Sequence, residues 1–356
     1  MVRKVLFATL TAAVVGLVAL TAAVVGAVAA PAAGTQPARD GAIRVTPRTI
    51  GVVDIIRQSP IDQQIDNIML LAGKKLGWKI DVIDAAGDPR KVVNAMQTFI
   101  TRNVDGIVLL SIAANNVRAQ LAAARAKGIP VIEIGAGVVP STLWSAQYGE
   151  DEARIARTIA EYIVKYDPNA KIADLKTHLV SNAIVRAAEL RAVVKAQGKA
   201  SIVAETEVDL SNPVVNTQKA VTDMLTAHPD ITAIHAVFDN MAHAAIQTVI
   251  RKRSKAKVYS YFTAPETVAN LRKDTPLQAV ADVNLALTGA IAIDQLARFY
   301  ELKTPIDRNA VDKHPLTYLI VDRSNVDRLL RNKKVVFPVE QLLAPFVKRW
   351  QNEFSK

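Results

Sequence analysis

The sequence contains no cysteine, and this absence excludes several kinds of site. Without cysteine the chain has no disulfide, no thiolate ligand for a metal and no cysteine nucleophile. It also lacks the N-terminal cysteine to which a lipid anchor would be attached.

Short catalytic and metal-binding motifs are also absent from the sequence. The chain has 5 histidines, and no two of them stand four residues apart, as the ligands of a helical zinc site do. There is no nucleophile elbow and no P-loop lysine motif. Residues 135–140 come nearest to a dinucleotide fingerprint, but Pro140 replaces its third glycine and disfavours the helix start that would hold the phosphates. We interpret this segment as a tight turn, and we expect a protein that is not an enzyme and has no metal or cofactor.

Length and composition favour a globular protein with two domains. The chain has 356 residues, of which 50% are hydrophobic and 22% are charged. Disordered chains contain fewer hydrophobic residues, and single cores stop growing at roughly 250–300 residues. A chain of this length therefore suits two lobes.

The N-terminus has the features of an export signal. The basic pair Arg3 and Lys4 precedes an uncharged apolar run over residues 5–30, which ends in small residues at 27–29. This pattern predicts a signal peptide over residues 1–29. The run is also long enough to span a membrane, so a retained anchor is the alternative. Either arrangement places the rest of the chain in the periplasm or elsewhere outside the cytoplasm.

The chain is basic, with a formal net charge of +11. Removing residues 1–29 takes away two basic residues and no acidic one, which leaves +9. The densest basic run, residues 251–257, suits the C-terminal end of a solvated helix. It contains no aromatic residue of the kind that stacks on bases, so we expect no nucleic-acid partner.

Apolar runs of strand length alternate with amphipathic runs of helix length. In the first half we expect strands at 50–56, 79–83, 106–110 and 130–134, and helices at 62–75, 91–102 and 117–127. In the second half we expect strands at 171–175, 202–207, 231–238, 257–262, 277–283 and 316–321, and helices at 151–165, 183–197, 214–227, 241–251, 265–272, 285–302 and 339–354. This alternation predicts an α/β protein with two Rossmann-like lobes, each built on a parallel sheet. Ligands of such sheets bind at the carboxyl ends of the strands, so paired lobes predict a cleft between those ends.

Several segments together resemble one family of proteins. They are residues 49–53, 58–60, 104–108, 128–132 and 236–242. Their order resembles the ribose- and galactose-type periplasmic binding proteins that serve ABC importers, over residues 47–325. The resemblance implies the type I periplasmic binding protein fold, in which three crossing segments form a hinge. It also implies a monomer that closes on a small solute, sugar-like or less polar, and then docks to a membrane permease.

The same resemblance implies how the chain is divided. After a linker over residues 30–46, the N-terminal lobe comprises 47–147 and about 284–310. The C-terminal lobe comprises 148–283 and about 311–325, and residues 326–356 form a helical tail that we expect to pack on the protein.

The resemblance also implies a set of ligand-binding residues in the cleft. Positions that match the family's polar contacts and walls are Gln58, Ser59, Ile61, Asp62, Ser111, Arg186 and Leu210. Other family positions carry different residues here, namely Gly135, Ala136, Phe238, Phe262 and Val283 with its neighbour Asp282. Since these replace acidic and amide groups, we expect a cleft less hydrophilic than a ribose site.

Acidic residues inside the predicted strands need partners if they are buried. For Asp174 we expect an internal pair, whereas Asp54 and Asp282 could face either a ligand or an internal partner. Asp239 is expected to cap a helix that begins at Asn240.

Three other functions share parts of this pattern. A binding protein that presents its ligand to a membrane receptor would have the same fold, and fold alone does not decide between them. A sugar-operon repressor would need a DNA-reading helix-turn-helix before residue 47, where the export-like segment stands. An enzyme would need catalytic groups that form no recognisable motif.

Overall fold

A computed structural model describes residues 43–135, 141–332 and 334–354 of the chain. The predicted signal peptide, nearly all of the predicted linker, and Ala136 lie outside these residues. Among the described helices, none is both long enough and apolar enough to cross a membrane.

The first sheet contains five parallel strands in the order β2-β1-β3-β4-β5. They are β1 (Thr49–Asp54), β2 (Lys79–Asp84), β3 (Gly106–Leu110), β4 (Val131–Ile134) and β5 (Ala146–Tyr148). The strands β1 and β3 are almost entirely buried, as the continuous apolar runs predict. The three-residue strand β5 was not predicted, because so short a segment carries no periodic signal.

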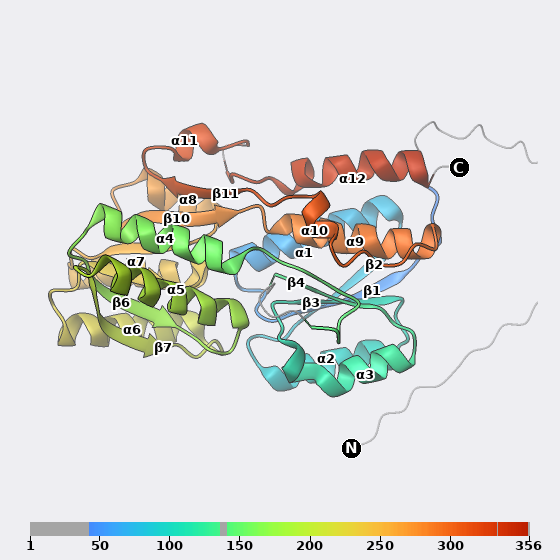
Figure 1. Ribbon diagram of the computed structural model, residues 1–356, viewed down its shortest axis with the longest axis horizontal. Helices are drawn as coiled ribbons and strands as arrows, with labels where there is room; N and C mark the ends of the chain where they lie inside the picture. The colour runs from blue at the N-terminus through green and yellow to red at the C-terminus, as the bar shows by residue number, and fades with distance from the viewer. Residues whose placement is uncertain (1–42, 136–140, 333, 355–356) are drawn as a thin grey trace, which may run out of the picture. The chain divides into compact units, whose positions relative to one another are not determined.

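Helices cover both faces of this sheet (Figure 1). On one side lie α2 (Pro89–Thr101) and α3 (Arg118–Ala126), and on the other lie α1 (Pro60–Leu76), α9 (Ala286–Glu301) and α12 (Val339–Glu353). Helix α3 occupies nearly all of the predicted range 117–127, and a 3-10 turn over Ala114–Val117 directly precedes it.

The second sheet has six strands in the order β11-β10-β9-β8-β6-β7. They are β6 (Lys171–Lys176), β7 (Ser201–Glu207), β8 (Ala233–Ala236), β9 (Lys257–Tyr261), β10 (Leu277–Val283) and β11 (Tyr318–Asp322). The sheet is parallel, as expected, except that β11 pairs with β10 in the antiparallel direction. Strand β10 leads toward the first lobe and β11 returns from it, so the two neighbours run in opposite directions.

The helices that accompany the second sheet are α4, α5, α6, α7, α8 and the short α11. Their bounds are α4 (Glu152–Tyr166), α5 (Ser181–Gln197), α6 (Pro213–Ala227), α7 (Asp239–Lys252), α8 (Pro265–Arg272) and α11 (Val326–Leu329). Helix α10 (Ala310–Lys313) packs against α9 instead.

Three segments that lie side by side connect the two lobes, at residues 149–151, 284–285 and 314–317, and the chain crosses once more between α11 and α12. Hydrogen bonds tie these segments to one another. The Asp151 N–H donates to the Tyr318 hydroxyl over 2.6 Å, and the Thr317 N–H donates to Asn284 Oδ1 over 2.7 Å. The three-segment hinge implied by the sequence is therefore present, and its segments are hydrogen-bonded neighbours.

The C-terminal helix α12 packs on the first lobe, in contact with α1 and α9. Its buried side chains are Leu343, Phe346 and Trp350, which share one face at helical spacing. The Trp350 indole N–H donates to the fully buried carboxylate of Asp294 over 2.8 Å. The tail is thus part of the first lobe's core.

Candidate functional site

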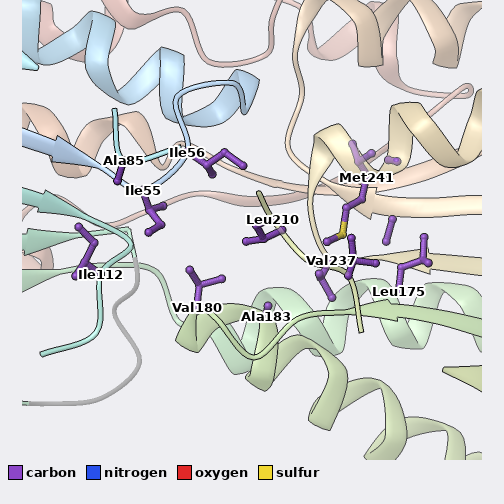
Figure 2. Packing of buried hydrophobic residues seen from close by; sticks show 14 of the residues in the cluster. Ile55, Ile56, Ala85, Ile112, Leu175, Val180, Ala183, Leu210, Val237 and Met241 are labelled. Carbon is purple, nitrogen blue, oxygen red and sulfur yellow. The ribbon is translucent and has the colours of Figure 1, made fainter. Parts of the chain in front are cut away.

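A small cavity lies between the two lobes, at the carboxyl ends of their strands. It is lined by Ile55, Ile56, Ser59, Ile61, Asp62, Ser111, Val180, Asn182, Leu210, Phe238, Asn240, Phe262 and Leu285. Ile55 directly follows β1, Ser111 follows β3 and Phe262 follows β9. In Figure 2 the side chains of Ile55 and Ile56 approach those of Leu210 and Val180 in this region. The cavity is therefore where parallel α/β sheets hold their ligands.

The cavity volume is only about 20 Å³, which is room for about one water molecule. Ligand pockets in proteins typically measure roughly 300–1,000 Å³. The lobes also touch through hydrogen bonds, including one from Gln64 Nε2 to the Thr263 carbonyl oxygen over 2.9 Å. A sugar-sized solute can enter only if the lobes separate or the lining side chains move.

Asp239 holds the two lobes together at one edge of the cavity. Its Oδ1 accepts hydrogen bonds from Ser59 Oγ (3.0 Å) and from its neighbour's backbone N–H, and its Oδ2 accepts one from the Ile61 N–H (3.1 Å). Helix α7 begins at Asp239 itself, so the expectation that this residue caps a helix starting at Asn240 is wrong. The carboxylate instead satisfies donors at the N-terminus of α1, in the opposite lobe, where the helix dipole favours negative charge.

Three carboxyl groups form a buried cluster beside the cavity, which we call the acid cluster: Asp54, Asp62 and Asp66. Each of these carboxyls is near enough to another for their negative charges to repel. Burial, followed by repulsion from Asp66, raises the pKa of Asp54 to about 8. Burial and the neighbouring carboxylates raise the pKa of Asp62 well above its usual range. Burial also raises the pKa of Asp66 to about 6, although Arg57 opposes this shift from 2.9 Å away.

The acid cluster makes stability depend on pH. Between the unfolded pKa near 4 and the folded pKa of about 8, folded Asp54 holds a proton that the unfolded chain has lost. Stability from this group therefore falls as pH rises across that window. We expect Asp54→Asn to flatten the decline in the urea midpoint between about pH 5 and about pH 8, since asparagine keeps the bond to the Ile56 N–H. The control is Asp81→Asn. Asp81 pairs with Arg102 away from the acid cluster, so its replacement should leave the decline in the urea midpoint unchanged.

Two phenylalanines form the aromatic wall of the cavity, and Arg186 stacks behind them. The guanidinium carbon of Arg186 lies 5.4 Å from the ring centroid of Phe238, 5.1 Å from that of Phe262 and 4.0 Å from that of Tyr261. Arg186 is fully buried and does not line the cavity. The expectation of a direct ligand contact is corrected here, because internal partners occupy the guanidinium.

Those partners are two glutamates and a carbonyl. Arg186 donates to Glu152 Oε1 over 2.5 Å, to Glu150 Oε1 over 3.1 Å and to the Val237 carbonyl oxygen over 2.6 Å. Burial opposes the positive charge, but Glu152 and Glu150 together hold the pKa of Arg186 above its ordinary value. Arg186 is therefore the centre of an internal ion-pair network that supports the aromatic wall.

The structure brings together seven of the expected ligand-binding residues. Ser59, Ile61, Asp62, Ser111, Leu210, Phe238 and Phe262 line the cavity. Gln58 is exposed outside it, because the chain turns there before α1 begins at Pro60. Gly135 has a φ of +82°, and a Cβ there would lie 3.0 Å from Leu110 Cδ1, so any other side chain at this position would be strained.

The acids inside the strands have internal partners. Asp174 Oδ1 lies 2.7 Å from His235 Nδ1, so the internal pair expected for Asp174 is confirmed. Asp282 is buried and bonds to the Thr263 hydroxyl and the Val283 N–H, outside the cavity lining. Asp54, in the acid cluster, is likewise turned to internal partners.

Six lining residues were not anticipated from the sequence: Ile55, Ile56, Val180, Asn182, Asn240 and Leu285. Their shared feature is position, since all lie in the loops or first helical turns that follow strands. That signal was available for Asn240, which stands four residues after the end of β8. The buried Oδ1 of Asn240 has no hydrogen-bond partner in the described structure.

Comparison with known proteins agrees with this geometry. The family model described as a periplasmic binding protein domain matches residues 51–303. The chain belongs to this family. The periplasmic binding protein domain is 24% identical over 255 residues to the ribose import binding protein of Bacillus subtilis (strain 168), covering 69% of this chain and 79% of that one.

Solved structures share the fold of this periplasmic binding protein. A solute-binding protein of an ABC transporter from Mycobacterium smegmatis, with bound glycerol, has a TM-score of 0.71 and 24% identity over 82% of this chain and 99% of that one. The solute-binding protein of a 5-methylthioribose transporter from Thermotoga lettingae has a TM-score of 0.74 and 16% identity over 88% of this chain and 97% of that one. The two-lobed α/β fold predicted from the sequence is confirmed.

Two of the six described non-glycine residues with positive φ in this periplasmic binding protein line the cavity. Ser111 has a φ of +57° and Phe262 a φ of +65°, a region that bulky side chains rarely adopt. Each directly follows a strand and lines the cavity. Such strain costs on the order of 1–3 kcal/mol and gathers at binding sites, where the surrounding structure fixes the side chains in place.

Proposed function

We propose that the protein captures a small solute between its lobes, outside the cytoplasm, and delivers it to the permease of an ABC importer. The observation that carries this proposal is the interlobe cavity, which joins an aromatic wall to a few polar groups at the carboxyl ends of both sheets. The family and the relatives described above are binding proteins, and two of those relatives serve ABC transporters or ribose import. The protein acts by binding and release, without chemical conversion of the solute.

The aromatic wall indicates which solutes fit. Phe238 and Phe262 offer ring faces to the apolar side of a ligand, while Asn182 and Asn240 offer amide groups. Highly hydroxylated sugars would lose water from more hydroxyls than the cavity can pair. The solute is therefore a small polyol or a sugar with an apolar substituent or face, such as the glycerol and 5-methylthioribose bound by the structural relatives.

A thermal-shift screen of polyols, pentoses and deoxygenated or thio-substituted sugars tests this proposal. A solute at about 100 times its Kd should stabilise the protein by about 2.7 kcal/mol. Phe238→Leu should weaken binding of the best solute about tenfold, since an aromatic contact contributes about 0.5–1.5 kcal/mol beyond its area. Phe299→Leu, which changes a half-buried ring outside this cavity, is the matched control. Stabilisation by ribose and other free pentoses alone would contradict the proposed solute class.

Export can be tested at the N-terminus. If residues 1–29 are a signal peptide, sequencing the protein from its native host should give a chain that begins near Ala30. Full-length protein in the membrane fraction would indicate the retained anchor instead. Recovery of full-length protein in the cytosol would contradict export.

The partner is tested separately by crosslinking solute-loaded protein in membranes of the host. We expect capture of an ABC permease and loss of solute uptake when the gene is deleted. Capture of a sensory receptor with normal uptake would contradict delivery to an importer.

A further inference from the structure

Few polar side chains face the cavity, and they are Ser59, Asp62, Ser111, Asn182 and Asn240. Ser59 Oγ already donates to Asp239, and Asn182 Oδ1 already accepts from the Ala183 N–H. Asn240 is 7% exposed, and its Oδ1 is buried without a partner in the described structure. Asp62, at 6% exposure, contributes a carboxyl group to the lining. A buried acceptor without a donor is costly, so Asn240 Oδ1 calls for a donor on the ligand, and the Asp62 carboxyl lies in the same lining.

Acidic side chains also outnumber basic ones around the acid cluster. The titratable groups that face the acid cluster from the elements packed on it are Arg57 before α1, Asp84 at the end of β2, and Asp239 and His243 on α7. Arg57 is the one permanent cation among them, and it pairs with Asp66. The described cavity lining contains no lysine, arginine or histidine. An ionised Asp62 carboxylate would have no cationic partner within this lining.

The aromatic wall suits a cation as well. Phe238 and Phe262 border the cavity and already receive the Arg186 guanidinium, whose charge is offset by Glu150 and Glu152. A cation placed against such a ring gains about 0.5–2 kcal/mol, most where water is excluded. Carboxylate, amide oxygen and ring faces together form the kind of surroundings that bind an ammonium group.

We propose that the physiological solute carries a protonated amine, which binds between the Asp62 carboxylate and Asn240 Oδ1 against the phenyl rings. The proposal rests on the solute-binding function and deepens it, because it names the chemical class of the solute. The solute is an amino polyol or an amino sugar, and the apolar wall contacts its carbon skeleton.

Proton release accompanies binding of such a solute. Burial and mutual repulsion raise the pKa values of Asp54 and Asp62, so the acid cluster holds protons before the amine arrives. The ammonium group stabilises the ionised carboxylate and expels a proton. Affinity for the amine therefore increases as pH rises toward about 8, provided that the amine itself stays protonated. A neutral polyol has no such dependence.

Calorimetry with matched pairs of solutes tests the proposal. The pairs are glycerol and 3-aminopropane-1,2-diol, ribitol and 1-amino-1-deoxyribitol, and glucose and glucosamine. We expect the amine of at least one pair to bind tenfold or more tightly than its hydroxyl partner. Titrations in phosphate and in MOPS buffer, which differ in ionisation enthalpy, should show release of protons.

Variants locate the contact. Asp62→Asn should abolish the preference for the amine over its hydroxyl partner, together with the proton release. Asp84→Asn removes a nearby carboxylate that does not line the cavity, and the preference should remain. Unchanged preference in Asp62→Asn would overturn the assigned site.

The inference and the proposed function fail in different ways. If hydroxyl solutes bind as tightly as their amines, the amine inference is overturned and solute capture stands. If no member of any pair binds while a neutral sugar does, the inference is again overturned. If no solute of any class binds, the proposed function itself is overturned.

Discussion

Replacing Arg186 with alanine is expected to destabilise the folded protein by about 3–5 kcal/mol. The side chain is fully buried, and its removal would leave the carboxylates of Glu150 and Glu152 buried without their cation. The Val237 carbonyl would also lose its donor. Urea unfolding of the solute-free protein measures the effect directly.

Two further variants separate the charge effect from a loss of packing. Arg191→Ala changes an exposed arginine on the same helix, paired with Glu205, and should cost no more than about 1 kcal/mol. Combining Arg186→Met with Glu150→Gln and Glu152→Gln removes all three charges, and we expect much of the lost stability to return. A single Arg186→Ala variant of normal stability would contradict the ion-pair network as the reason for burying this arginine.

Replacing Trp350 with alanine is expected to cost about 3–5 kcal/mol of folding stability. The indole is fully buried between α12 and the first lobe, with its ring centroid 6.4 Å from that of Phe346. Its N–H is one of the donors to the buried carboxylate of Asp294. The loss should appear as a lower urea midpoint in the solute-free protein.

The substitution Trp350→Phe divides this effect into its parts. Phenylalanine keeps most of the buried volume but donates nothing to Asp294, so its cost should be smaller than that of alanine. Leu342→Ala, at a half-buried position of the same helix, should also cost less. Equal stability of wild type and Trp350→Ala would show that α12 is dispensable to the first lobe.

The order of strands and helices could be predicted because apolar runs and helical periodicity are local properties of the chain. The direction of β11 could not, since it depends on where the chain travels between β10 and β11. Strand β5 was too short to detect. Sequence patterns thus predicted the order of the helices and strands, but not the direction in which β11 pairs.

The site was predictable only in part, for a similar reason. Residues that follow strands, such as Ser111 and Phe262, reach the cavity because parallel strands end at a common edge. Arg186 matched a ligand-binding position, but its direction is decided by Glu150 and Glu152, which lie more than thirty residues away at the crossing into α4. Asp239 similarly accepts hydrogen bonds from Ser59 and Ile61, which lie in the other lobe. Contacts between residues so far apart in the sequence leave no pattern in the local sequence.

The contact of α12 with α1 has a consequence for how the protein is made. Residues 60–76 are made well before residues 339–353, yet both belong to the same core. Until the ribosome has produced α12, the first lobe lacks the helix that covers α1, so this lobe completes its core late in synthesis.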